Sequence, residues 1–158
     1  MDKILKLLKK NARMSVEDMA LATSMSIEEV TQTIKKLEQE KVILGYYPVL
    51  NLNVIDEPNV TALVEIKFSL NDKIGFQELS NTIANMDEVD SVHLVSGGYD
   101  LCIVMRGKDI QEIAFFVNEK LSSMECVLST NTHFVLKTFK EHGYHTADRK
   151  TDKREVML

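Results

Sequence analysis

The 158-residue sequence has no apolar run long enough to cross a membrane, and charged residues interrupt the apolar ones throughout its first ten positions. A transmembrane helix needs about 20 apolar residues, and a signal peptide needs a continuous apolar core. Cysteine is scarce too, because Cys102 and Cys126 stand alone, without the paired spacing of a disulfide framework or a thiol redox motif. The sequence therefore predicts a cytoplasmic protein with no membrane partner and two buried, inert thiols.

Motifs typical of catalysis and metal binding are also missing. The sequence contains no G-x-S-x-G elbow, no P-loop and no dinucleotide-binding glycine run. His142 and His145 lie three residues apart in a polar segment, but no cysteine or acidic pair at a fixed spacing completes a metal site. We therefore expect no enzymatic activity, no cofactor and no metal.

Charge is unevenly distributed along the chain, whose net charge is −5. Residues 1–50 contain eight Lys/Arg and seven Asp/Glu, whereas residues 51–158 contain eleven and seventeen. The first third is therefore nearly balanced and the remainder carries the acidity. The overall negative charge does not exclude a nucleic-acid partner for the first third.

The first third predicts three short helices. Apolar residues at helical spacing predict a helix over 2–10, and two capping boxes, led by Ser15 and Ser26, predict helices over 16–22 and 27–40. The turn Thr23-Ser24-Met25 separates the last two. A short helix, a three-residue turn and a longer helix form the helix-turn-helix pattern, whose second helix enters the DNA major groove.

The second of these paired helices is the expected DNA-reading element. Its predicted buried stripe is Ile27, Val30, Ile34 and Leu37. The expected DNA-binding residues are Arg13, Ser26, Thr31, Gln32, Lys35 and Lys36. Gln32 suits an adenine edge, Thr31 a thymine methyl group, and the two lysines suit phosphates.

Two acids at the start of this helix, Glu28 and Glu29, oppose phosphate. We therefore expect weak, salt-dependent binding per half-site, reinforced by oligomerisation. The alternative is a helix-turn-helix fold that serves only protein contacts.

The segment after these helices contains two connecting pieces. Residues 42–50 read as β-rich chain with a glycine bend, which suits a winged-helix-like strand or a connector, and residues 51–59 read as a polar linker. The domain boundaries predicted from the sequence are 1–50, 51–59, 60–140 and a polar tail at 141–158.

Residues 60–140 predict the order βαββαβ. Strands are expected at 60–68, 89–96, 100–106 and 127–137, and helices at 76–86 and 110–121, with Ile110 facing inward. This order is the ferredoxin-like plan, so the whole chain is predicted to be α+β. Because two helices cover only one face of the sheet, we expect the other face to be buried in a symmetric homodimer, with tetramer or octamer formation beyond it.

The hairpin between the two middle strands contains the candidate effector site. It consists of Ser96, Gly97, Gly98, Tyr99 and Asp100. For an amino-acid effector, the glycines offer unobstructed peptide N–H groups, Asp100 suits the ammonium group, and Tyr99 suits a pocket wall. The alternative is a two-residue Gly-Gly turn that Asp100 merely ends. In either case the sequence predicts that the turn requires glycine.

A resemblance to a known family covers roughly residues 2–140. In the Lrp/AsnC (leucine-responsive/asparagine-responsive, feast/famine) regulators, an arginine, two serine-led helices around a turn, a Leu-Glu pair and a Val/Ile-x-Gly-Tyr segment occur in one order. The same order is found in RMSVEDMALATSMSIEEVTQTIKKLEQEKVILGYYPVLN. The second half is similar in Val89, residues 96–101 and residues 130–137.

This resemblance implies a ferredoxin-like module that assembles dimers into larger rings and binds amino acids between subunits. Three positions depart from the family: Ser24 replaces the usual glycine, Thr31-Gln32-Thr33 replaces commonly basic residues, and Gly98 replaces a frequent acid. We expect a sequence-specific transcriptional regulator that binds double-stranded DNA, oligomerises through its C-terminal domain and responds to an amino acid or similar effector. The alternative is an oligomeric small-molecule-binding module whose N-terminal domain acts through protein contacts.

Overall fold

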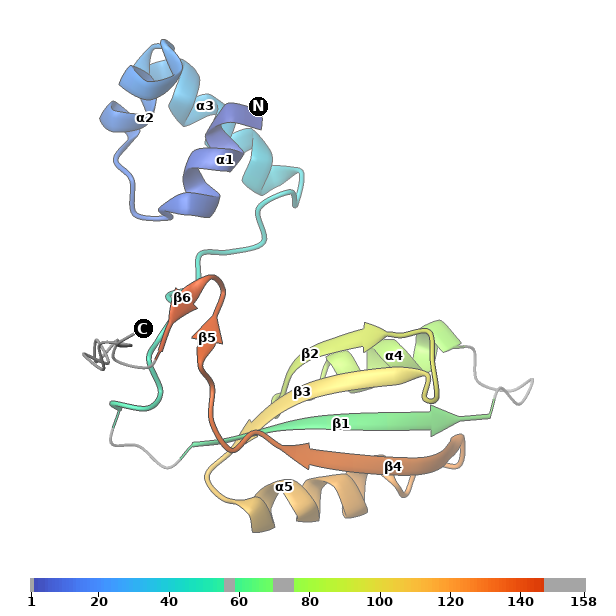
Figure 1. The fold of residues 1–158 in the computed structure, drawn as a ribbon. Helices are drawn as coiled ribbons and strands as arrows, with labels where there is room; N and C mark the ends of the chain where they lie inside the picture. The colour runs from blue at the N-terminus through green and yellow to red at the C-terminus, as the bar shows by residue number, and fades with distance from the viewer. Residues whose placement is uncertain (1, 56–58, 70–75, 147–158) are drawn as a thin grey trace, which may run out of the picture. The chain divides into compact units, whose positions relative to one another are not determined.

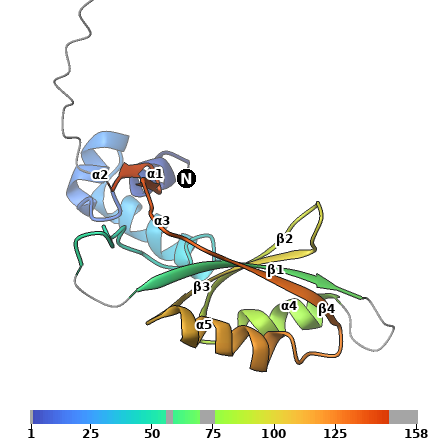
Figure 2. The ribbon, with the colours of Figure 1, turned by 60° about the horizontal axis from the view of Figure 1, so that its bottom comes forward.

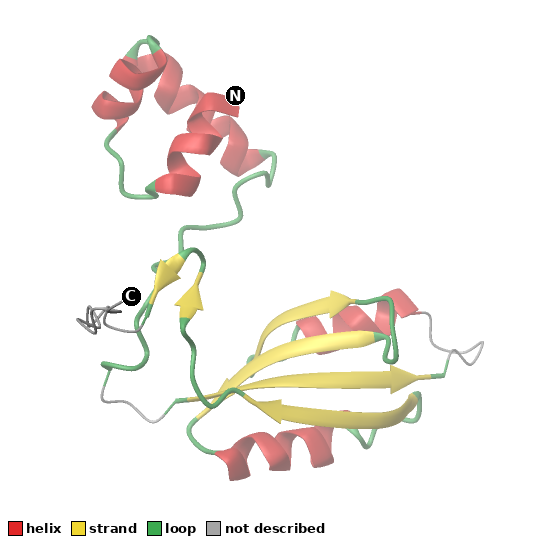
Figure 3. Ribbon diagram, viewed as in Figure 1, coloured by secondary structure: helices red, strands yellow, loops and turns green. Residues whose placement is uncertain are grey.

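The computed structural model describes residues 2–55, 59–69 and 76–146, in two compact units divided between Leu50 and Asn51. The first unit is helical and the second combines a sheet with helices (Figures 1 and 3). Within the described residues, no helix is both long and apolar enough to cross a membrane.

The first unit contains the three predicted helices, α1 (Asp2–Lys10), α2 (Val16–Thr23) and α3 (Ile27–Gln39). The Ser15 hydroxyl caps α2 by accepting a hydrogen bond from the Asp18 N–H at 3.0 Å. At α3 the capping box is complete, because Ser26 Oγ accepts from the Glu29 N–H and Glu29 Oε2 accepts from the Ser26 N–H. Ser24 ends α2 in the left-handed region, with φ +58°, where glycine is sterically favoured.

The core of the first unit is small. Its buried residues are Ile4, Met19, Ala20, Val30 and Leu37. Ile27, predicted to be inward, is 51% exposed because it occupies the first position of α3, beyond the reach of this core.

The β-rich segment predicted after α3 is not a strand. Residues 43–50 adopt no regular secondary structure. The Tyr46 hydroxyl donates to Glu38 Oε1 at 2.9 Å and so holds the chain against the end of α3. The strand prediction was wrong because a strand needs a neighbour to pair its backbone groups, and the described part of this unit contains only helices. The irregular segment fits the alternative prediction of a connector.

The second unit has the predicted βαββαβ order. Its main elements are β1 (Val60–Phe68), α4 (Phe76–Ala84), β2 (Val89–Leu94), β3 (Leu101–Gly107), α5 (Ile110–Phe116), the π-helical turn η1 (Val117–Leu121) and β4 (Val127–Phe134). The strands form one antiparallel sheet in the order β2-β3-β1-β4. Central β1 pairs Val64 with Ile103 of β3 and with Thr132 of β4. This arrangement confirms the ferredoxin-like fold.

Both helices cover the same face of the sheet (Figure 2). That face is lined by alternate residues of β1 and β3, which pack with helix residues in one cluster that includes Ala62, Val64, Ile66, Leu101, Ile103, Met105, Leu79, Ile83, Ile113 and Phe116. Ile110, predicted to be inward, is 54% exposed because it is the first residue of α5. The residues that alternate with these along each strand lie on the opposite face of the sheet, which we call the open sheet face. In β1 they include Leu63, Glu65 and Lys67.

A second, two-stranded sheet follows β4. It is the hairpin of β5 (Lys140–Glu141) and β6 (Tyr144–His145), in which Lys140 pairs with His145 and Glu141 pairs with Tyr144. The sequence placed residues 141–158 in a polar tail; 141–146 are instead ordered in and beside this hairpin, and 147–158 lie outside the described residues.

Candidate functional site

The loop between β2 and β3 contains the candidate effector residues. Leu94 pairs with Leu101, and the Val95 N–H donates to the Asp100 carbonyl at 3.0 Å, which leaves Ser96, Gly97, Gly98 and Tyr99 as a four-residue loop. The two-residue Gly-Gly turn is therefore wrong. Among the described residues, the N–H groups of 96–99 make no backbone hydrogen bond, which leaves them suited to an anionic ligand.

The two glycines of the loop are not required by its backbone. Neither Gly97 nor Gly98 has a positive φ, and an added Cβ at either position would meet no atom within 4 Å. The prediction that the turn requires glycine is therefore wrong. Because Gly97 and Gly98 have no side chains, the space over these two residues is open.

Asp100 connects the loop to the end of β1. Its N–H donates to the Ile66 carbonyl at 2.9 Å, and its carboxylate oxygen Oδ2 accepts from the Phe68 N–H at 3.1 Å. The Lys67 ammonium group donates to the Gly98 carbonyl at 3.2 Å and provides a third contact between β1 and the loop. Asp100 therefore has a structural role, and one of its carboxylate oxygens is already hydrogen-bonded.

A polar cluster lies beside this loop on the open sheet face. Asn131 of β4 donates from Nδ2 to Glu65 Oε2 at 3.1 Å, and His133 Nε2 lies 3.3 Å from the same oxygen. Strand register explains the cluster, since Glu65 is paired with Asn131 on one side and with Cys102 on the other. Polar residues at alternate positions of β1 and β4 were the sequence signal for this cluster, which was not assigned to the site.

The cluster changes the acidity of its members. Partial burial raises the pKa of Glu65, but hydrogen bonds from His133 and Asn131 outweigh it and leave this pKa below its ordinary value. The negative charge of Glu65 raises the pKa of the Tyr99 phenol. Burial, with a further contribution from Glu65, raises the pKa of Cys102, so this thiol stays protonated at neutral pH. Tyr99 of the loop is therefore close enough to Glu65 of the polar cluster for the charge of one to affect the other.

The candidate DNA-binding residues lie in the first unit and most of them face solvent. Arg13, Ser26, Gln32, Lys35 and Lys36 are exposed and Thr31 is half-buried. The hydroxyls of two of the six residues are hydrogen-bonded within α3, since Thr31 Oγ1 donates to the Ile27 carbonyl and Ser26 Oγ caps the helix. Lys36 lies 3.8 Å from Glu40 in an exposed ion pair. Within α3, Gln32 and Lys35 therefore remain the most available of these side chains for DNA.

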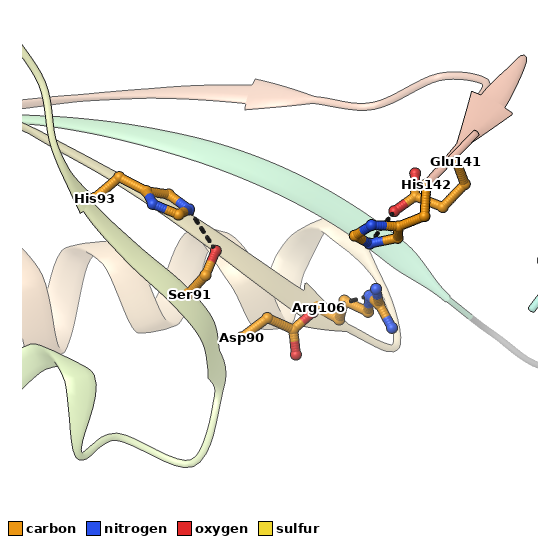
Figure 4. Close-up of polar contacts among 6 residues, drawn as sticks. All are labelled: Asp90, Ser91, His93, Arg106, Glu141 and His142. Carbon is orange, nitrogen blue, oxygen red and sulfur yellow. Dashed lines mark hydrogen bonds and ion pairs between the residues drawn. The ribbon is translucent and has the colours of Figure 1, made fainter. Parts of the chain in front are cut away.

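His142, which was considered for metal binding, and His93 have separate partners (Figure 4). His142 Nε2 lies 3.4 Å from Glu141 Oε1, and His93 Nε2 lies 3.1 Å from the Ser91 hydroxyl. Figure 4 also shows Arg106 of β3 paired with Asp90 of β2. The Arg106 Nε atom lies 2.9 Å from Asp90 Oδ2. Across residues 2–55, 59–69 and 76–146, no three His, Cys, Asp or Glu side chains are grouped to hold a metal ion.

Comparisons with known proteins match both units. The AsnC-type helix-turn-helix domain matches residues 2–38, and the Lrp/AsnC ligand binding domain matches residues 61–144. The chain is 40% identical over 157 residues to the HTH-type transcriptional regulator YugG of Bacillus subtilis, covering 98% of this chain and 93% of the relative. It is 29% identical over 142 residues to the leucine-responsive regulatory protein of Haemophilus influenzae, covering 90% of this chain and 85% of that relative.

A solved structure supports the fold. The complex of a Neisseria meningitidis transcriptional regulator with L-methionine superposes with a TM-score of 0.70 at 21% identity, covering 88% of this chain and 89% of the other. The two family matches lie one in each structural unit, and together they account for both. The chain belongs to the Lrp/AsnC family of transcriptional regulators.

Proposed function

We propose that this regulator reads DNA with α3 of its helix-turn-helix unit and responds to an amino acid bound at the loop formed by residues 96–100. The observation that supports DNA reading is the exposed face of α3, which carries Gln32 and Lys35. By contrast, the Ser26 hydroxyl caps the helix and the Thr31 hydroxyl donates to the Ile27 carbonyl. Arg13 and Lys36 add positive charge for phosphate contacts. The protein acts in the cytoplasm as a homodimer or a larger homo-oligomer.

The DNA-reading role is tested by the double substitution Gln32→Ala/Lys35→Ala. A bidentate glutamine–adenine contact contributes about 1–3 kcal/mol of discrimination, so binding to the promoter region of the protein's own gene weakens about tenfold or more. Loss of Lys35 also lowers the slope of log affinity against log salt by about one per contacted phosphate. Electrophoretic mobility shifts at several salt concentrations measure both quantities.

The matched control is Lys108→Ala/Gln111→Ala, which removes the same side-chain types from exposed positions in the second unit. Equal binding by the α3 variant and the control would eliminate specific readout by this helix. It would favour the rival function, a small-molecule-binding module whose first unit contacts proteins.

The effector proposal rests on the loop between β2 and β3. Its unbonded N–H groups suit a carboxylate, and the space over Gly97 and Gly98 admits a ligand. Asp100 is proposed to receive the ammonium group, with Ser96 and Tyr99 at the sides of the site. The L-methionine bound by the Neisseria relative makes an amino acid the first ligand class to test.

A thermal-shift screen of the twenty amino acids, followed by calorimetry, tests this site. Asp100→Asn is the informative variant, because the amide oxygen still accepts the Phe68 N–H while the negative charge is lost. We expect the melting temperature without ligand to stay near that of the wild type and the affinity for the effector to fall at least tenfold. Unchanged affinity would exclude Asp100 as the ammonium acceptor, and no ligand for the wild type would exclude the effector role.

A further inference from the structure

The β5–β6 hairpin is held in place by contacts from outside itself. Its connection is a two-residue turn in which His142 and Gly143 both have positive φ, +44° and +91°, as in a type I′ turn. Each strand has only two residues, and an isolated hairpin is at best marginally stable in water. Something beyond the turn must therefore stabilise it.

The residue that closes the hairpin is Thr146, a polar residue with only 8% of its surface exposed. Its N–H donates to the Phe139 carbonyl at 3.1 Å, and its hydroxyl donates to the Thr138 carbonyl. Both bonds lie at the open end of the hairpin, opposite the turn. Thr146 therefore joins the two chain segments where they enter and leave the hairpin.

Two asparagines that precede β1 in the chain bond to the same two residues. Asn51 donates from Nδ2 to the Thr146 carbonyl at 2.9 Å, and Asn53 donates from Nδ2 to the Thr138 carbonyl at 3.3 Å. Asn51 is itself fixed in a turn, since its side-chain oxygen accepts from the Asn53 N–H and its carbonyl accepts from the Val54 N–H. Residues more than 80 positions apart in the sequence are thus joined by side-chain amides to main-chain carbonyls.

We infer that Asn51, Asn53, Thr138 and Thr146 form a latch, in which the C-terminal hairpin holds the chain at the point where it leaves the DNA-binding unit. The region predicted as a linker begins at Asn51, so its first residues are fixed to the second unit. The latch residues act on DNA binding as positioning residues, since none of them belongs to the DNA-reading helix.

The latch shortens the tether between the two units. The Tyr46 hydroxyl bonds to Glu38 of α3, and the chain reaches latched Asn51 five residues later. Without the latch, the next position fixed in the sheet is Val60, fourteen residues from Tyr46. Once one DNA-binding unit of an oligomer is bound, the tether length sets the effective concentration of a second unit at the DNA. This concentration falls roughly as the −3/2 power of tether length, so release of the latch lowers it about fivefold.

Hydrogen exchange measured by mass spectrometry on the full chain tests the latch itself. Asn51→Ala/Asn53→Ala is expected to speed exchange in the peptide covering residues 139–146 about fivefold or more, although no residue of the hairpin is altered. Thr146→Val, which removes the hydroxyl at nearly constant shape, is expected to speed exchange at Asn53 and Val54. Exchange in β1 should stay as in the wild type for both variants.

Asn118→Ala, at an exposed position of η1, serves as the control asparagine variant and should change neither peptide. If the double asparagine variant leaves the hairpin as protected as the control does, the latch does not exist. If β1 loses protection as well, the asparagines support the whole fold and the inference of a local latch is wrong.

The positioning role is tested with promoter DNA and rests on the DNA binding proposed above. The latch variants should bind about three- to fivefold more weakly than the wild type, with an unchanged slope of log affinity against log salt, because no phosphate contact is lost. Unchanged affinity together with a faster-exchanging hairpin would overturn positioning. Failure of the wild type to bind DNA would overturn both the proposed function and positioning, whereas the exchange experiment would still decide whether the latch forms.

Discussion

Gly97 and Gly98 differ from Gly107 in what surrounds their Cα atoms. A Cβ added at Gly97 or Gly98 meets no atom within 4 Å, and neither residue has a positive φ. At Gly107 an added Cβ would lie 2.9 Å from Ile113 Cγ1, a contact that real Cβ atoms essentially never make. Ile113 is fully buried in the core and has little room to move.

These surroundings predict opposite effects of Gly→Ala substitutions. Gly98→Ala should leave the free energy of unfolding unchanged or raise it by up to about 1 kcal/mol, because alanine restricts the unfolded chain. Gly107→Ala should lower it by about 1–3 kcal/mol through overpacking. Urea unfolding of both variants measures the difference. If Gly98→Ala destabilises as much as Gly107→Ala, the loop depends on glycine after all.

For individual residues, the sequence predicted which ones lie together in the β2–β3 loop better than it predicted the contacts that they make. Gly97, Gly98 and Asp100 do lie together in one loop, as their adjacency requires. The engagement of Asp100 with Phe68 and the cluster of Glu65 with Asn131 and His133 depend on strand register across the sheet. The hydrophobic pattern and the turns set this register between strands that are far apart in the sequence, so the local spacing within one strand does not specify which of these side chains meet.

The start of α3 is stabilised by an ionisable capping box. The Ser26 N–H donates to Glu29 Oε2 at 2.8 Å, and hydrogen bonds from the Ser26 backbone and hydroxyl lower the pKa of Glu29 from its ordinary value of 4.5. A lowered pKa in the folded state stabilises the fold above the unfolded value, and this stabilisation is lost as the pH falls through the folded value. The capping box should therefore weaken as the pH falls below about 4.5.

Glu29→Gln provides the comparison, because glutamine retains the capping geometry without a titratable group. Urea titrations followed through the amide resonances of α3 should show a wild-type midpoint that falls between pH 5 and pH 3 more steeply than that of the variant. Other carboxylates titrate in both proteins and contribute equally to both curves. Parallel curves would show that Glu29 does not stabilise α3 as a carboxylate.

Elements with strong periodicity or caps were predicted from the sequence, and elements that depend on partners were not. The capping serines located the starts of α2 and α3, and alternation located β1. Residues 43–50 have β-rich composition but no strand to pair with in the described part of their unit. The β5–β6 hairpin was missed because two-residue strands have too short a pattern and its His-Gly turn lacks the usual Asn-Gly or Asp-Gly signal.

The whole second unit presents one covered and one uncovered sheet face. Helices α4 and α5 pack on the same face (Figure 2), and the resulting core accounts for the buried residues of β1 and β3. The βαββαβ order was predictable because hydrophobic periodicity specifies each element in turn. The sequence also predicts that a second copy of the chain covers the open sheet face, and this stays a prediction, since that face combines apolar Leu63 and Val104 with the charged Glu65 and Lys67.

We predict that the open sheet face is the homodimer interface, and Leu63→Glu tests this prediction. Leu63 lies on central β1 and is 38% exposed, so the substitution places a carboxylate on the same strand face as Glu65 and opposite its symmetry mates in an isologous dimer. Like charges brought together in an interface cost several kcal/mol, so the dimer dissociation constant should rise at least a hundredfold. Sedimentation equilibrium measures that constant.

The control for this prediction is Phe115→Glu. Phe115 lies on α5 and is 68% exposed, so the substitution introduces the same charge on the helix side of the sheet and should leave the dimer intact. Dissociation by Phe115→Glu, with an intact Leu63→Glu dimer, would instead place the interface on the helices.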